Sequence, residues 1–142
     1  MAGSEAGTPA PNPGDMVEFI RPKGYSHFGI CVGNGQVVHL SKDKPQMGIK
    51  STIQKEYLEK VAAGDSYRVN NQDDKKSPIP PEEIVKKANA MVGEKMLWTP
   101  FHNCETVASE MRYGDGKGHS EQTLKATDWG QDFTHNVLNP GF

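Results

Sequence analysis

The stretch NCETVASEMRYG (residues 103–114) contains a cysteine in a position suited to nucleophilic chemistry. Asn103 is a favoured N-cap residue, and Val107, Ala108 and Met111 follow at helical spacing, so Cys104 is predicted to lie in the first turn of a helix. Unpaired backbone N–H groups and the positive end of the helix dipole would face its sulfur. Such surroundings favour a thiolate and can hold an oxyanion. We therefore predict that Cys104 is a nucleophile; the alternative is the small buried thiol that most free cysteines are.

The second cysteine, Cys31, stands in HFGICVG between two apolar residues, with no helix end nearby. A thiol in apolar surroundings is inert, so we predict a structural role for it. Two cysteines do not make a disulfide framework, and a reducing, intracellular setting fits best.

A nucleophilic thiol needs a base, and two of the five histidines flank a predicted hairpin around Gly33-Asn34-Gly35. A two-residue turn would place His27 and His39 on opposite faces, because side chains alternate along a strand. A three-residue loop would instead pair His39 with Gly29 and put His27 diagonally across on the same face. If both histidines serve one site, the three-residue register is required.

The three side chains together have the composition of a cysteine version of the serine triad. In this interpretation Cys104 attacks, His27 is the general base and His39 orients it. Two alternatives stay open. In the first alternative, the cysteine and the two histidines are three ligands of a zinc ion. In the second, the histidines are two unrelated sheet residues whose ring nitrogens bond to backbone or water.

The elements that must position these residues can be read from periodicity. Strands are expected at 15–21 and 66–70 and in the hairpin 27–40. Helices are expected within 77–95, with prolines at the start and Gly93 near the end, and over 103–114, whereas 51–64 is ambiguous between helix and strand. Strands followed by helices indicate an α+β domain with a small antiparallel sheet packed on helices.

The composition is that of one ordinary water-exposed domain. The chain has 142 residues, of which 35% are hydrophobic and 24% charged, with a net charge of −2. This balance gives no basic field for nucleic acid, and no apolar run reaches the roughly 20 residues that span a bilayer. We expect a flexible leader over 1–12, a domain over 13–124 and a loosely attached tail over 125–142. Nothing indicates an interface, so a monomer is expected.

Several segments together resemble the phospholipase A/acyltransferase family, also called HRAS-like suppressors, of the lecithin:retinol acyltransferase-like group. They are PGDMVEFIRP, HFGICVGNGQVVHL, AGDSYRVNN, SPIPPEEIVKKANAMVG, NCETVASEMRYG and SEQ, from Pro13 to about Gln122, in the family's order. The 12-residue interval from His27 to His39 matches as well.

The resemblance implies a permuted NlpC-type, papain-like fold. It matches Cys104 to the nucleophile, His27 to the base and His39 to the third polar residue. It also implies attack on glycerophospholipid esters through an acyl-cysteine, without calcium, another metal or a cofactor. Arg21 is a candidate for holding the lipid phosphate, and Asn103 and the region of Tyr25 are candidates for the oxyanion.

The sequence also departs from the family pattern. The tail lacks the family's usual hydrophobic C-terminal anchor, one extra residue lies between Arg21 and His27, and Phe28 replaces the usual tryptophan. A cytoplasmic location is therefore expected, with peripheral contact to membranes left open. An alternative is a picornaviral non-structural protein with the same histidine box and asparagine–cysteine motif, which would bind host or viral proteins without enzyme activity.

Overall fold

The computed structural model describes residues 10–22, 26–42, 50–99 and 103–115. Within them one antiparallel sheet has the strand order β5-β1-β2-β3-β4-β6. The strands are β1 (Met16–Ile20), β2 (Ser26–Gly33), β3 (Gln36–Lys42), β4 (Lys50–Tyr57), β5 (Tyr67–Val69) and β6 (Lys95–Leu97). The helices are α1 (Leu58–Ala62), α2 (Pro81–Met91) and α3 (Cys104–Tyr113). The α+β class and the antiparallel sheet are confirmed, whereas the permuted papain-like label stays a prediction.

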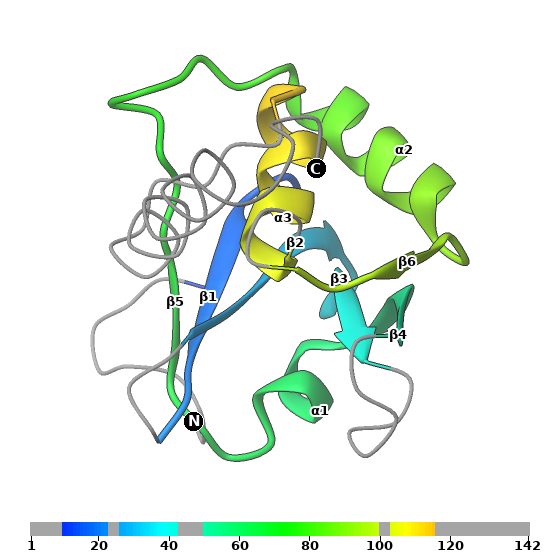
Figure 1. The fold of residues 1–142 in the computed structure, drawn as a ribbon. Helices are drawn as coiled ribbons and strands as arrows, with labels where there is room; N and C mark the ends of the chain where they lie inside the picture. Colours follow the sequence, from blue (N-terminus) through cyan, green and yellow to red (C-terminus); the bar gives the residue numbers. More distant parts are fainter. Residues whose placement is uncertain (1–9, 23–25, 43–49, 100–102, 116–142) are drawn as a thin grey trace, which may run out of the picture.

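The helices cover both faces of the sheet, because alternate residues of β1 to β3 are apolar on each side. On one face Met16, Phe28 and Ile30 pack with α2 and α3. On the other face Val17, Phe19 and Val37 pack with α1. Figure 1 shows α2 and α3 together on one side of the strands and α1 apart from them.

The ambiguous segment 51–64 contains both kinds of structure. Its first part is β4, and its second part is the short helix α1. Pairing of β4 with β3 over seven residues overrides the weak helical stripe that Ile53, Tyr57 and Val61 suggest. The three-residue strand β6, which pairs with the other edge of β4, was not predicted from the sequence.

The hairpin combines the two turns that the sequence left open. Gly33 pairs with Gln36 across a two-residue Asn34-Gly35 turn, whose residues both have positive φ, 57° and 70°. An irregularity between Cys31 and Gly33 then shifts the register, so that His39 pairs with Gly29. The expected register is confirmed, but the expected three-residue loop is wrong: a bulge absorbs the extra residue.

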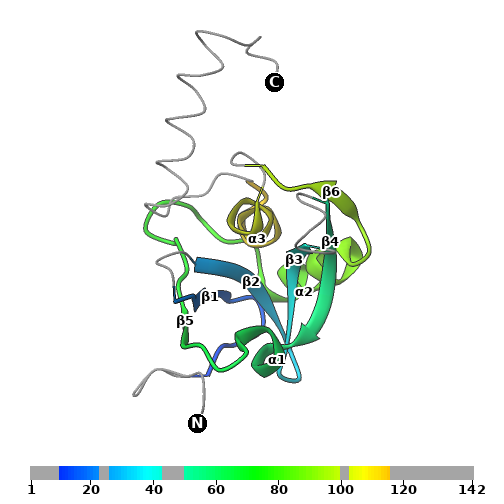
Figure 2. The same ribbon diagram turned by 60° about the horizontal axis from the view of Figure 1, so that its bottom comes forward.

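Strands β2 and β3 diverge beyond the hairpin. Their pairing ends at Gly29 and His39, while β2 continues to pair with β1 back to Ser26 and β3 continues with β4 up to Lys42. Figure 2 shows the two strands separating, with α3 above the opening between them. We call this opening, between residues 26–28 and 40–42, the fork.

None of the helices in the described ranges is long and apolar enough to cross a membrane. The predicted leader and tail, and with them the domain boundaries, lie wholly or mostly outside these ranges. They stay predictions.

Candidate active site

Cys104 is the first residue of α3, as the sequence predicts. Asn103 is the N-cap: its Oδ1 accepts from the backbone N–H groups of Glu105 (3.0 Å) and Thr106 (3.2 Å). In return Thr106 Oγ1 accepts from the Asn103 backbone N–H at 2.8 Å, which completes a capping box. The two reciprocal bonds fix the helix start and therefore the position of the cysteine.

The sulfur of Cys104 lies against the backbone of β2. The backbone N–H groups of Phe28, Glu105 and Cys104 itself are directed at it. Phe28 follows His27 directly and lies in the fork, where β3 no longer pairs with β2. The divergence of the two strands therefore leaves the edge of β2 available to the thiol, one residue from the predicted base.

The thiol of Cys104 is held in its neutral form. Burial raises its pKa to about 11, and this outweighs the lowering by the three backbone N–H groups. The lowered pKa expected from the helix position is thus wrong for this state. Desolvation, which depends on tertiary packing, is the larger effect.

The two histidines are joined directly. His27 Nε2 and His39 Nδ1 are 2.8 Å apart, and the rings are nearly perpendicular, at 89°. Both rings lie on the face of the sheet that carries Phe19, whose ring centroid is 5.9 Å from that of His27. The predicted pairing of these histidines is confirmed by the geometry.

Both histidines are kept neutral by their surroundings. Burial, aided by the charges of His39 and Arg21, lowers the pKa of His27 to about 3. Burial also lowers the pKa of His39, although the hydrogen bond and charge of Glu56 act in the opposite direction. A neutral imidazole at physiological pH is what a general base requires.

The described residues show no hydrogen bond between Cys104 Sγ and His27. Cys104 belongs to the core on the α2 and α3 side, whereas His27 packs with Phe19 on the other side. The structure brings the histidines together and places the sulfur beside the same strand. The sulfur–imidazole contact itself stays a prediction.

Glu56 completes the arrangement and was not found by sequence reasoning. Its Oε2 lies 2.6 Å from His39 Nε2, and its Oε1 lies 3.1 Å from Lys60 Nζ. His39 pairs with Gln54 across β3 and β4, which places Glu56 diagonally across on the same face. The sequence could have pointed to Glu56 only if residues 51–57 had first been assigned to a strand paired with β3.

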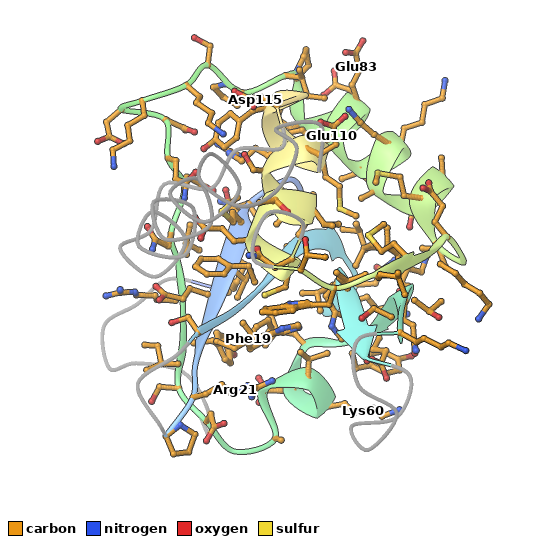
Figure 3. All side chains as sticks on the ribbon, in the orientation of Figure 1. Phe19, Arg21, Lys60, Glu83, Glu110 and Asp115 are labelled. Atoms are coloured by element: carbon orange, nitrogen blue, oxygen red, sulfur yellow. The ribbon has the colours of Figure 1, made fainter. Side chains whose placement is uncertain are left out.

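Arg21 is occupied at the C-terminus of α1. Its Nη1 donates to the Ala62 carbonyl (3.0 Å) and to Asp65 (3.1 Å), and its Nη2 donates to the Val61 carbonyl (2.9 Å). Figure 3 shows Arg21 beside α1. The predicted role in holding a lipid phosphate is untested and would require some of these bonds to be exchanged.

The sequence also singled out Asn103, Tyr25 and Cys31. Asn103 uses its side-chain oxygen for the cap, so the cap function is confirmed and an oxyanion role stays a prediction. Tyr25 lies outside the described residues. Cys31 is buried, and burial raises its pKa, in keeping with a structural thiol. No group of three or more metal-ligating side chains occurs within the described segments, so the zinc alternative gains no support.

Comparison with known proteins identifies the family of the chain. A model of the lecithin retinol acyltransferase family matches residues 9–117. Human phospholipase A and acyltransferase 3 is 40% identical over 119 residues, which cover 75% of this chain and 73% of that protein. Human phospholipase A and acyltransferase 4 is 36% identical over 129 residues, which cover 82% and 77%. The chain therefore belongs to the lecithin retinol acyltransferase family and groups there with the phospholipase A and acyltransferase proteins.

Proposed function

We propose that this protein is a thiol-dependent phospholipase A and acyltransferase that acts on glycerophospholipids through an acyl-cysteine. The observation that supports this most directly is the hydrogen bond between His27 on β2 and His39 on β3. Cys104, at the capped start of α3, lies against the same strand β2. The names of the relatives supply the substrate class and the two activities.

The proposed reaction begins with proton transfer from Cys104 Sγ to His27. The thiolate attacks the ester carbonyl carbon, and the backbone N–H groups near the sulfur are candidates to stabilise the developing oxyanion. The ester C–O bond then breaks, and the leaving lysophospholipid oxygen takes the proton from His27. A thioester remains on Cys104. Water, an amine or a lysolipid hydroxyl then gives a proton to His27 and takes the acyl group as the thioester C–S bond breaks. His27 returns that proton to the Cys104 thiolate, which regenerates the thiol.

The resting site holds a neutral thiol and a neutral imidazole, because burial disfavours both charged forms. Proton transfer is therefore uphill before substrate binds. We propose that the thiolate–imidazolium pair forms only as the lipid enters and the imidazole reaches the sulfur. No metal takes part in this scheme. We also propose that the protein acts as a monomer that meets membranes peripherally from the cytoplasm; cell fractionation and size-exclusion chromatography test these two points.

The function is tested by incubating the protein with phosphatidylcholine vesicles and measuring its intact mass. Wild type and Cys31→Ser should gain the mass of one acyl group, and Cys104→Ser should gain no thioester that hydroxylamine removes at neutral pH. Absence of both the adduct and released fatty acid, from folded protein with several phospholipids and detergents, would overturn the enzyme proposal. A role in binding host or viral proteins would then take its place.

A further inference from the structure

Glu56 extends the two-histidine contact into a chain of three hydrogen-bonded groups. The chain runs from His27 Nε2 to His39 Nδ1 (2.8 Å) and from His39 Nε2 to Glu56 Oε2 (2.6 Å). His39 is only 5% exposed and the Glu56 side chain 20% exposed, so water competes little for these bonds. Glu56 touches neither Cys104 nor His27 in the described contacts, and any effect on the reaction must pass through His39.

The direction of every hydrogen bond in this chain follows from the chemistry of one group. An ionised carboxylate can only accept, so the proton between Glu56 and His39 belongs to His39 Nε2. A neutral imidazole carries one N–H, and His39 Nδ1 must then accept. His27 therefore donates from Nε2, which leaves a lone pair on its Nδ1. That nitrogen is the one able to take a proton from a thiol.

Glu56 is held in the ionised form that this argument requires. Burial acts to raise its pKa, but hydrogen bonds from His39 and Lys60 outweigh burial and the pKa is lowered. Lys60 Nζ lies 3.1 Å from Glu56 Oε1, and its side chain is 73% exposed at the outer side of α1 (Figure 3). The exposed Glu56–Lys60 ion pair adds little to holding Glu56 in its ionised form, since exposed ion pairs are weak.

Without Glu56 the direction of the hydrogen bond between His27 and His39 would no longer be fixed. His39 could then carry its proton on Nδ1 and donate it to His27 Nε2. His27 would in that case carry its own proton on Nδ1, and the nitrogen facing outward from the pair could not act as a base. The identity of one residue on β4 thus decides which nitrogen of a residue on β2 is basic.

We propose that Glu56 is a positioning residue that selects the tautomers of His39 and His27 and so makes His27 Nδ1 the catalytic base. The consequence for catalysis rests on the proposed function, whereas the tautomers themselves do not. The sequence motifs of the site do not include Glu56, and only the packing of β4 against β3 brings it to His39.

The proposal is tested on protein with ¹⁵N-labelled histidines, using long-range ¹H–¹⁵N spectra that identify the protonated nitrogen of each ring. His27→Gln and His39→Gln variants assign the signals. Wild type should show the Nε2–H form at both residues near pH 7. In Glu56→Gln the amide N–H₂ can face His39, and we expect a large population of the Nδ1–H form at both rings.

The rate of acyl-enzyme formation is measured on the same samples. Glu56→Gln should be about 10- to 100-fold slower, at or below the lower end of the roughly 100- to 10,000-fold contribution of a general base, because the base itself remains and only its tautomer is shifted. Loss of the carboxylate charge should also move the acid limb of the pH–rate profile to lower pH, because that charge favours the protonated imidazole. A residue with a purely structural role would not shift the limb.

Glu59→Gln is the matched control, because it removes the same charge three residues away. Glu59 accepts a hydrogen bond from the Tyr67 hydroxyl at 2.7 Å, and glutamine can still accept it. This variant should keep wild-type tautomers and rates. If Glu56→Gln keeps the Nε2–H form at both histidines, the proposal is wrong, whether or not the wild-type protein acylates. If wild type shows the predicted tautomers but no acylation, only the proposed function fails.

Discussion

His27 Nε2 lies 2.8 Å from His39 Nδ1, although the two residues stand 12 positions apart on different strands. The contact forms where β2 and β3 stop pairing, and a bulge between Cys31 and Gly33 sets the register that allows it.

The first prediction concerns the space beside His39. A Cβ added at Gly29 would lie 3.2 Å from His39 Cβ and 3.2 Å from the Val38 carbonyl oxygen, so the histidine must shift by a few tenths of an ångström. We expect Gly29→Ala to slow acylation about 10-fold, because small misplacements of catalytic groups are costly. The unfolding temperature should fall by only a few degrees.

A double-mutant cycle checks that the Gly29→Ala effect passes through His39. In a His39→Ala background the added methyl group has no imidazole to displace, and the further loss of rate should be less than about 2-fold. Equal losses in both backgrounds would show that the strand, and not the imidazole, is the cause.

The second prediction concerns the protonation of Cys104. Since burial raises its pKa to about 11, alkylation by iodoacetamide should be slow at pH 7 and should rise about tenfold per pH unit up to pH 9. Peptide mapping after a timed reaction separates Cys104 from Cys31. Fast labelling of Cys104 that does not change between pH 5 and 7 would contradict this and indicate a preformed ion pair.

The third prediction concerns the pH dependence of stability. His27 has a folded pKa of about 3, below the value of about 6.5 for an unfolded histidine. Between these two values the unfolded chain binds more protons, so the free energy of unfolding falls as pH is lowered. Urea titrations of wild type should show a slope of up to about 1.4 kcal/mol per pH unit for this group.

His27→Gln is the comparison for that slope. The lowered pKa values of Glu18, Glu56 and Asp73 reduce stability only further toward acid, near and below the usual carboxylate range. A loss that begins near pH 6.5 in wild type and is smaller in His27→Gln therefore identifies the histidine. Stability that is flat from pH 6.5 to 5 in wild type would refute the prediction.

The fourth prediction separates the cap function of Asn103 from the chemistry of its neighbour. Asn103→Ala removes the acceptor for two backbone N–H groups and should lower stability by about 1 kcal/mol. Asn103→Asp keeps the acceptor and should keep the stability. Its negative charge beside Cys104 should nevertheless disfavour the thiolate and slow acylation.

Denaturant unfolding and acylation rates measured on the two Asn103 variants check this separation. Thr106→Val is a further control, since it removes only the other half of the capping box. If Asn103→Asp acylates as fast as wild type, the charge at this position does not reach the thiol.

The local elements were determined by the sequence itself. Helix α3 begins at Cys104 because Asn103 and Thr106 satisfy its first N–H groups, and these signals lie within four consecutive residues. Helix α2 begins at Pro81 for a similarly local reason, the fixed φ of proline in its first turn. The Asn34-Gly35 turn likewise depends on residues that tolerate positive φ.

Only the tertiary structure decided the features of the site that depend on residues far apart in the sequence. The bulge at Cys31 to Gly33, the strand character of 50–57 and the position of Glu56 all require pairing between β2, β3 and β4. Arg21 is engaged by α1, some 40 residues away in the chain. The predicted charge state of Cys104 differs most from the structure. Desolvation depends on everything packed around the sulfur, and it raises the thiol pKa by more than the backbone N–H groups near the sulfur lower it.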